Sequence, residues 1–469
     1  MLGKWITRHK NIILLIACVL LVPSVIGYVS TRVNYDVLSY LPNTLETVSG
    51  QDTLVDEFGM GAFSMIVVED MSNKQAAALE KKIEGIDHVK DVLWYDDMLD
   101  ISIPTEMLPK NLEEAFFNGN ATMMIALFDD TTSADDTMDA ITNIRKTVGK
   151  DVYASGMSGV VTDIKNLALQ EMPIYVVIAA VLSLVVLIIT MDSFLTPFIF
   201  LANIGMAIVF NLGSNIFLGE ISYITQALAA VLQLAVTMDY SIFLLESYEA
   251  NKKRFPDDRK RAMAHAISNT FKSVSSSSVT TIAGFVALCF MTFKLGANIG
   301  IVMSKGVVIG VITCVTVLPA MILTFDNAIG KTTHKALIPP LTKVSDFIVK
   351  HYKIAIVVFL VLLGPAIYGN SNYKIYYNID QGLPKNIPSA EANDKLKEHF
   401  NMSNVHMVLL KDGLSAKDKN QMIKKIEKVD GVKWVIGLNS LVGPNFPETM
   451  IPEDVKSMLK TDKIGRAHV

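Results

Sequence analysis

The sequence is poor in the residues on which disulfide-stabilised proteins and many enzymes depend. Only three of its 469 residues are cysteines, and Cys18, Cys289 and Cys314 all fall in apolar stretches, so no disulfide framework supports the parts in water. The eight histidines are scattered, and no nucleophile, metal-ligand cluster or phosphate-binding loop stands out in the most polar segment, residues 31–172. We therefore expect a protein that is not an enzyme and that has no metal or other cofactor.

The sequence is rich in hydrophobic residues, which make up 51% of the chain beside 19% charged residues. A chain confined to the bilayer would not tolerate that much charge, so the composition indicates a membrane protein with large parts in water. Seven apolar stretches are long enough to span a bilayer. They are residues 11–30, 173–190, 194–218, 221–245, 278–294, 299–325 and 354–370.

Basic residues beside these stretches predict their direction. Three of them precede the first stretch, which lacks a cleavage signature and is expected to stay as an anchor with the N-terminus in the cytoplasm. Loops 246–277 and 326–353 hold seven and five basic residues against four and two acids, on the side that this orientation makes cytoplasmic. Segment 31–172 then lies outside, and its 25 acids against 10 bases disfavour binding to nucleic acid.

Asp239 is the only charged residue between Ile221 and Leu245. A lone carboxylate near the middle of a spanning helix costs on the order of 2.5–3.5 kcal/mol on insertion scales, and such residues are functional by default. We expect Asp239 to face a helix bundle and to gain and lose protons. The phenol of Tyr240, the next residue, is a candidate hydrogen-bond donor.

Other polar residues lie in or near the neighbouring apolar stretches. Ser277, Ser278 and Thr281 begin the next stretch, where they either support a proton path to Asp239 or serve as small residues that let helices pack closely. Gln233 precedes Asp239 by six residues, so the two do not clearly share a helix face. Lys305 is expected to extend its ammonium group to the membrane surface.

Segment 31–172 alternates short β-rich runs with helical patterns, at residues 63–69, 73–85, 89–95, 122–128, 134–148 and 152–155. The order β-α-β-β-α-β matches the split βαβ arrangement of ferredoxin-like domains. Ser72 and Gln75 predict a capping box at the start of the first helix. The acids between 129 and 139 do not have the spacing of an EF-hand loop, and we interpret them as a solvated face.

The chain also resembles itself at a distance of about 343 residues. Residues 82–89 are echoed by 425–432, residues 104–109 by 447–452, and the region 34–42 by 377–384. One repeat thus comprises a membrane helix, an outer domain and five more helices, and a second repeat starts at the seventh stretch. Residues 464–469 look like translated sequencing adapter, so we expect the natural sequence to end near Lys463. We expect the complete chain to be about twice as long as one repeat of 343 residues.

These features together resemble the RND superfamily and, within it, the MmpL-like (MMPL) transporters of bacterial membranes. The most specific likeness is Met238-Asp239-Tyr240-Ser241-Ile242-Phe243-Leu244, which is similar to the family's Asp-Tyr proton-relay segment. Residues 280–288 and the run from Gly306 to Ala320 support it. Two departures are the absence of glycines just before the Asp-Tyr pair, and the lack of the tenth helix on which relatives carry a second polar partner.

The resemblance implies an α-helical membrane protein with an RND-type bundle, seven of an expected twelve helices, and an α+β ferredoxin-like extracytoplasmic porter domain. It implies the following division of the chain: 1–30 first transmembrane helix, 31–172 porter domain, 173–325 five-helix bundle resembling a sterol-sensor region, 326–353 cytoplasmic loop, 354–370 seventh transmembrane helix, 371–463 start of a second porter domain, and 464–469 adapter.

The implied function is export of lipidic or other hydrophobic molecules across the cytoplasmic membrane, driven by proton entry, with Asp239 and Tyr240 as the proton relay. The implied partners are a hydrophobic substrate, protons and membrane lipids, and homo-oligomerisation stays open. The alternative is a non-transporting, sterol-sensor-like receptor or scaffold. Asp239 favours transport, because a sensor needs no titrating acid in the middle of the membrane.

Overall fold

The chain forms two compact units in a computed structural model. The first unit comprises residues 1–33, 172–291 and 296–379, and the second comprises residues 34–171, 292–295 and 380–469. The structure describes residues 2–97, 101, 104–108, 110–149, 151–334, 342–373, 382–402, 406–411, 414–433, 435–437 and 464–468. The predicted echoes at 378–380 and 447–452 lie outside the described residues.

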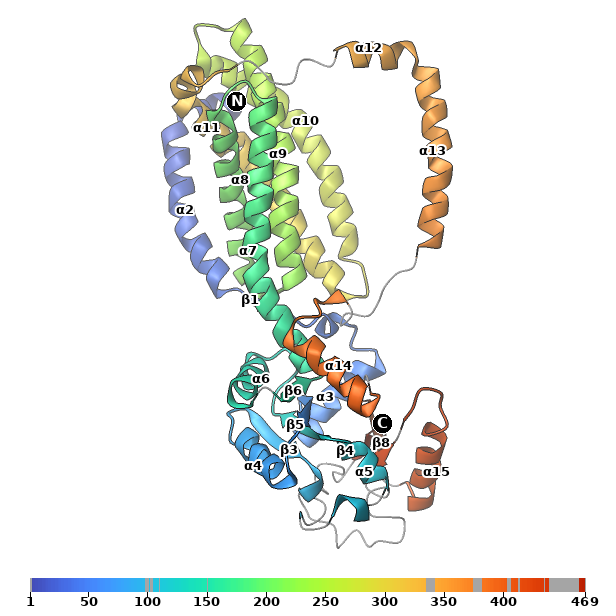
Figure 1. Cartoon of the computed structure of the whole chain (residues 1–469). Helices are drawn as coiled ribbons and strands as arrows, with labels where there is room; N and C mark the ends of the chain where they lie inside the picture. The colour runs from blue at the N-terminus through green and yellow to red at the C-terminus, as the bar shows by residue number, and fades with distance from the viewer. Residues whose placement is uncertain are drawn as a thin grey trace. The chain divides into compact units, whose positions relative to one another are not determined.

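The first unit is helical (Figure 1). Its helices are α1 (Leu2–Arg8), α2 (Lys10–Ser30), α7 (Met157–Thr190, which starts in the second unit), α8 (Leu195–Gly213), α9 (Tyr223–Arg254), α10 (Arg259–Leu288), α11 (Lys294–Lys331), α12 (Thr342–Lys350) and α13 (Tyr352–Asn372). A short 3-10 helix, η4 (Ser214–Leu218), follows α8, and β1 (Arg32–Asn34) pairs with β7 (Glu220–Ser222). α8 lies beside α9, and α9 beside α10.

Six helices among the described residues are long and apolar enough to span a membrane: α2, α7, α8 with η4, α9, α11 and α13. They contain six of the seven predicted stretches to within two residues at either end. The fifth prediction, residues 278–294, was wrong in where the helix ends, because α10 ends at Leu288 and α11 begins at Lys294. That α10 spans the membrane stays a prediction. The first half of α10 carries Arg259, Lys260, Arg261 and Lys272, so its apolar part is short.

Two glycines let α2 and α8 approach closely. A Cβ added to Gly27 would lie 2.3 Å from the carbonyl oxygen of Gly213, and one added to Gly213 would lie 2.0 Å from that of Ser24. Without a hydrophobic driving force between helices in lipid, such small residues gain packing contacts that larger ones prevent. The contact between α2 and α8 therefore depends on the absence of both side chains.

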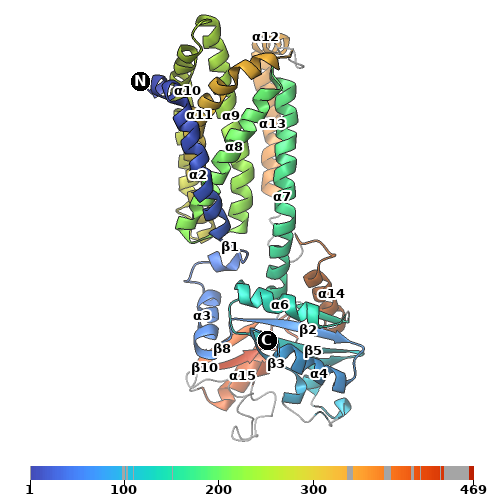
Figure 2. The ribbon, with the colours of Figure 1, turned by 90° about the vertical axis from the view of Figure 1, so that its left-hand side faces the viewer.

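The second unit contains a sheet with the strand order β3-β5-β2-β6, in which all neighbours are antiparallel (Figure 2). Its strands and helices follow the chain as β2 (Ala62–Glu69), α4 (Asn73–Glu84), β3 (Val89–Leu93), β5 (Ala121–Phe128), α6 (Asp135–Thr147) and β6 (Val152–Ser155). These six elements confirm the six predicted runs to within two residues. The predicted capping box is also present, because the Ser72 amide donates to the Gln75 side chain at 3.0 Å.

The unit has further elements outside this pattern. They are η1 (Leu38–Tyr40), α3 (Glu46–Phe58), η2 (Tyr95–Asp97), η3 (Thr105–Met107), α5 (Lys110–Phe116), β4 (Phe117–Asn118), α14 (Pro388–Phe400), β8 (Met407–Lys411), α15 (Ala416–Ile426), β9 (Ile436–Gly437) and β10 (Ile464–His468). β4 pairs with β5, and β8, β10 and β9 form a separate three-stranded sheet.

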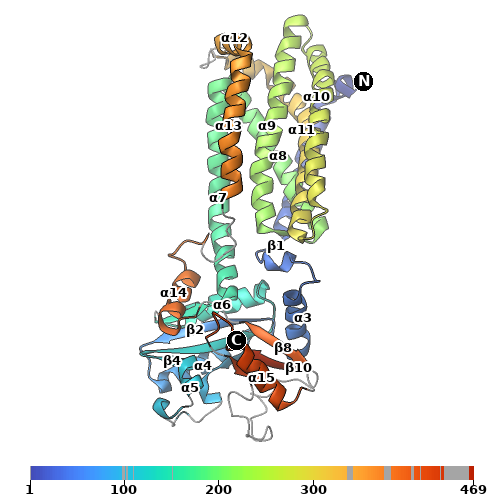
Figure 3. The ribbon, with the colours of Figure 1, turned by 90° about the vertical axis from the view of Figure 1, so that its right-hand side faces the viewer.

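Both faces of the larger sheet are covered. Ile66 and Met124 point to the face on which α4 and α6 pack, whereas Met65 and Met123 point to the opposite face. On that opposite face, α14 packs with Leu396 and Phe400, and the end of α3 packs with Phe58 (Figure 3). This explains why β2 is buried on both sides and does not alternate between buried and exposed residues.

Charged groups fasten α14 to the sheet. Lys395 Nζ lies 2.9 Å from Glu69 Oε1, and His399 Nε2 contacts the same oxygen. Burial opposes the charge on Glu69, but the hydrogen bonds from these two side chains outweigh it and lower the pKa of Glu69. At the other end of α14, the Ser389 amide donates to Asp163 Oδ2 at 2.7 Å, and Arg145 pairs with the same carboxylate.

The elements that follow residue 342 repeat the order of those at the N-terminus. α13 begins 342 residues after α2 and has the same length, 21 residues. α14 begins 342 residues after α3, and both end at a residue in the left-handed conformation, Gly59 or Asn401. α15 follows α4 at 343 residues, each with a serine at its N-cap. The described elements thus agree with the sequence repeat.

The close approach of α2 and α8 gives a first prediction. Gly27→Ala places a methyl group against the Gly213 carbonyl, and overpacking of this kind costs about 1–3 kcal/mol. We expect a lower midpoint of thermal unfolding for the purified chain in detergent. Gly205→Ala on α8 is the control, because a Cβ there meets no atom within 4 Å. Equal midpoints for the two variants would contradict the packing described.

Candidate functional site

Helix α9 has two different faces. Buried residues recur along one face, at Thr225, Ala229, Gln233, Thr237, Tyr240, Ser241, Leu244 and Tyr248. Exposed residues recur at spacings of three and four on the other face, at Leu228, Leu232, Ala235, Asp239, Phe243 and Glu246. Both sets follow the helical period, so each forms a continuous stripe along α9. We call the second set the exposed α9 stripe.

Asp239 lies in the middle of the exposed α9 stripe, whereas Tyr240 is buried and only 4% exposed. The structure thus corrects one expectation: Asp239 does not face the interior of the bundle that the described helices form. Consecutive residues of a helix point about 100° apart, so burying Tyr240 among the helices turns Asp239 outward. Tyr240 packs in a core that includes Leu244, Cys314 and Leu318.

The hydroxyl groups of α10 bond within their own helix. Ser278 is buried and its hydroxyl donates to the Val274 carbonyl at 2.7 Å, and Thr281 donates to the Ser277 carbonyl at 3.3 Å. Ser277 is exposed. Bonds of this kind satisfy the hydroxyls of Ser278 and Thr281 without another helix. These bonds therefore favour the interpretation as small residues that let helices pack closely. The role of these residues in a proton path stays a prediction.

A polar cluster inside the bundle joins α8, α9 and α11. Asn211 Nδ2 donates to Gln233 Oε1 at 2.9 Å, and Gln233 Nε2 donates to the Gly306 carbonyl at 3.3 Å. Lys305 Nζ donates to the Asn211 carbonyl at 2.9 Å and to Asn215 Oδ1 at 2.5 Å. Partners on α8 and η4 thus hold the ammonium group of Lys305. Its predicted place at the membrane surface stays a prediction.

Glycines on α11 allow α9 and α11 to approach beside this cluster. A Cβ on Gly306 would lie 2.6 Å from Asn211 Nδ2, and a Cβ on Gly310 would lie 2.7 Å from Thr237 Oγ1. Gly306 and Gly310, a small-xxx-small pair in α11, thus allow α9 and α11 to approach closely near Asp239 and Tyr240. The lack of glycine just before Asp239 does not prevent it.

The family model for the MMPL family matches residues 59–338, more than half of the chain. The chain belongs to the MMPL family. Together with the six helices of spanning length, this makes it a multi-pass membrane protein of the MmpL-like, RND type. The matched region contains Asp239, Tyr240 and the polar cluster around Gln233.

Two relatives have names that describe a function. Siderophore exporter MmpL5 of Mycobacterium tuberculosis (strain CDC 1551 / Oshkosh) is 23% identical over 320 residues, which cover 65% of this chain and 33% of the relative. "Probable transport protein MmpL12" of Mycobacterium tuberculosis (strain ATCC 25618 / H37Rv) is 24% identical over 315 residues, 64% of this chain and 27% of the relative. The chain spans about a third or less of the length of these MMPL proteins. Their names support membrane transport at the level of the family.

A second polar group of this MMPL chain lies where α9, α10 and α11 meet near Arg254. Asp326 is buried, accepts a hydrogen bond from the Tyr248 hydroxyl at 3.1 Å, and pairs with Arg259 and Lys252. Sequence reasoning missed this group. The signal in the sequence was Asp326, an acid directly after the sixth apolar stretch. The preceding helix, α10, begins with the basic residues Arg259, Lys260 and Arg261.

The buried cluster gives a prediction for α9. Gln233→Leu removes the acceptor of Asn211 Nδ2 and leaves that donor buried, and hydrogen bonds between membrane helices contribute about 0.6–2 kcal/mol. We expect a lower unfolding midpoint for the purified chain in detergent. Gln226→Leu on the same helix is the control, since Gln226 takes part in none of these bonds. An equal loss in both variants would argue against the cluster as a stabilising contact.

Proposed function

We propose that this MMPL chain serves in proton-driven export of lipidic or other hydrophobic molecules across the cytoplasmic membrane. The observation that carries the proposal is the position of Asp239, the only charged residue between Ile221 and Leu245, on an exposed and largely apolar stripe of a spanning helix. Apolar residues of the stripe are stable against lipid, but a carboxylate is not. Asp239 therefore needs a polar path or further helices beside α9.

Proton exchange at Asp239 would supply the driving force. The carboxylate takes up a proton from the outer side, becomes neutral, allows the helices beside α9 to shift, and releases the proton to the cytoplasm. One proton moving down 100 mV yields about 2.3 kcal/mol. A tenfold uphill gradient of a neutral substrate requires about 1.4 kcal/mol. One proton in each cycle is therefore enough for such a gradient.

Tyr240 and the hydroxyls of α10 have supporting parts in the proposal. Tyr240 lies next to the proton carrier and fixes the rotation of α9, because its ring is buried in the core of the bundle. Ser277 is exposed on α10, and α10 packs beside α9, so its hydroxyl is available to water on the proton path. Ser278 and Thr281 contribute to the packing of the same helix.

The second unit is proposed to be the porter domain, on the outer side of the membrane. Its strand order β3-β5-β2-β6 and the chain order β-α-β-β-α-β support a ferredoxin-like domain. Its excess of acids and the basic residues in loops 246–277 and 326–353 support the orientation with a cytoplasmic N-terminus. The echo of α3, β2 and α4 in α14, β8 and α15 supports the start of a second porter domain.

The proposal predicts that Asp239→Asn, edited at the native locus, abolishes export as completely as deletion of the gene. Asparagine keeps the shape of the side chain but cannot exchange a proton. Untargeted mass spectrometry of the lipids retained in cells and released from them measures the effect, so the substrate need not be known. Glu246→Gln is the matched control, because Glu246 lies on the same stripe and its loss should leave the profile of the wild type.

Two outcomes would contradict the proposal. If deletion leaves every lipid profile unchanged, lipid export is wrong. If deletion changes a profile and Asp239→Asn does not, the proton role of Asp239 is wrong, and a sterol-sensor-like receptor or scaffold becomes the better explanation, since that function needs no titrating acid.

A further inference from the structure

Glu80 lies on the buried face of α4, where the spacing of an amphipathic helix predicts an apolar residue. It lies four residues after Ala76 and three before Ile83, both fully buried in the core beneath the sheet, and it is itself only 3% exposed. Burying a charged group without a partner is unfavourable by several kcal/mol. A glutamate at this position therefore requires a compensating interaction.

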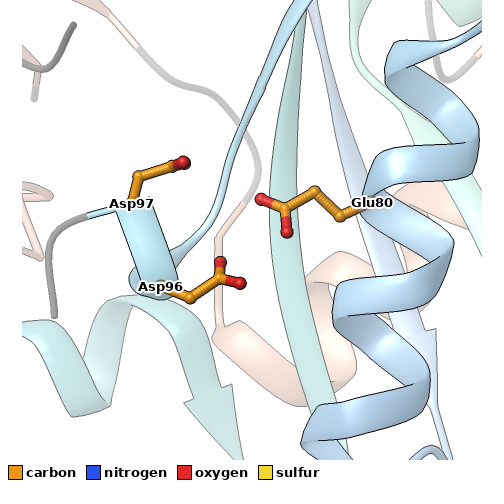
Figure 4. A group of neighbouring side chains, drawn as sticks. All are labelled: Glu80, Asp96 and Asp97. Atoms are coloured by element: carbon orange, nitrogen blue, oxygen red, sulfur yellow. The ribbon is translucent and has the colours of Figure 1, made fainter. Parts of the chain in front are cut away.

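The side chain of Glu80 points toward two more carboxylates (Figure 4). Asp96 and Asp97 belong to η2, which follows strand β3, and one oxygen from each of the three residues lies within 4.8 Å of the others. The Trp94 amide donates to Asp97 Oδ2 at 3.0 Å and fixes that carboxylate in place. Two separate segments of the chain, α4 and η2, thus bring their oxygens to one place. We call Glu80, Asp96 and Asp97 the carboxylate trio.

Among the described residues, no basic side chain forms an ion pair with the carboxylate trio. Glu80 Oε1 and Asp96 Oδ1 are buried and have no hydrogen-bond partner. Burial, and then the charges of Asp96 and Asp97, raise the pKa of Glu80 well above its ordinary range. The unpartnered oxygen of Glu80, on the buried face of α4, is the feature that distinguishes the trio from the solvated acids at 129–139.

We propose that Glu80, Asp96 and Asp97 bind one hard divalent cation, with calcium as the preferred ion. Calcium is bound by oxygen ligands at about 2.3–2.6 Å, so two ligands on opposite sides of the ion lie up to about 5 Å apart. The spacing within the trio fits this range. Calcium also accepts irregular sets of six to eight oxygens, whereas magnesium demands a near-ideal octahedron. Water would complete the coordination on the exposed side.

Cation binding would fasten α4 to η2. Both elements pack in the same hydrophobic core, α4 through Ala76 and Ile83, and η2 through Tyr95. The ion would join the two elements at the edge of this core. The proposal concerns the second unit alone. It holds or fails independently of Asp239 and of the direction in which the chain crosses the membrane.

The test uses the full chain in detergent, stripped of metals with EDTA and then titrated with terbium, a luminescent substitute for calcium. Trp94 and Tyr95 lie beside the carboxylate trio and would transfer excitation energy to a bound terbium ion. We expect sensitised emission that calcium displaces, and a calcium-dependent rise in the unfolding midpoint. Glu80→Gln and Asp97→Asn should weaken calcium binding at least tenfold. Asp139→Asn, an exposed acid of α6, is the control and should bind as the wild type does.

The wild type alone can overturn the proposal, so the result does not depend on the folding of a variant. Absence of both sensitised emission and a calcium-dependent shift would mean that the trio shares protons and holds no metal. Emission that survives in both Glu80→Gln and Asp97→Asn would place the ion at another site. Displacement by magnesium at lower concentration than calcium would overturn the choice of calcium.

Discussion

Every polar group that this chain removes from water needs a partner, because an unpaired buried donor or acceptor costs about 1–3 kcal/mol and an unpaired charge more. This constraint determines the contacts in both units. In the second unit, Asp163 accepts from Arg145 and from the Ser389 amide, and Glu69 accepts from Lys395 and His399. The contacts of Ser389, Lys395 and His399 join elements that are more than two hundred residues apart in the sequence.

The same constraint explains the use of glycine in the helical unit. Side-chain amides reach across helices only when the backbones are close, and lipid offers no hydrophobic force to bring them together. Gly306 makes room for the hydrogen bond between Asn211 and Gln233, and Gly310 allows α11 to approach Thr237. Packing and polar pairing therefore depend on each other along the contact between α9 and α11.

Local patterns made most elements predictable from the sequence. Apolar runs located six spanning helices, and alternation with turn residues located all six elements around the larger sheet. The failures have a common physical origin. The hydrogen bonds of Lys305, the outward position of Asp239 and the meeting of Glu80 with Asp96 and Asp97 depend on residues distant in sequence, which periodicity does not encode. Glu80 at an apolar position of its helix was the one local signal of the carboxylate trio.

The exposure of Asp239 follows from the partners of its neighbours. Turning α9 far enough to bury Asp239 among the described helices would pull Tyr240 out of its core and break the bonds of Gln233 to Asn211 and Gly306. Those interactions fix the rotation of α9, and the exposed stripe is their consequence. A carboxylate at such an exposed position is stable in a membrane only while it is protonated, hydrated or paired with a polar group outside the described helices. Movement between such states is what coupling to a proton gradient requires, so in the proposed function the rigidity of the buried face of α9 would keep Asp239 available for proton exchange.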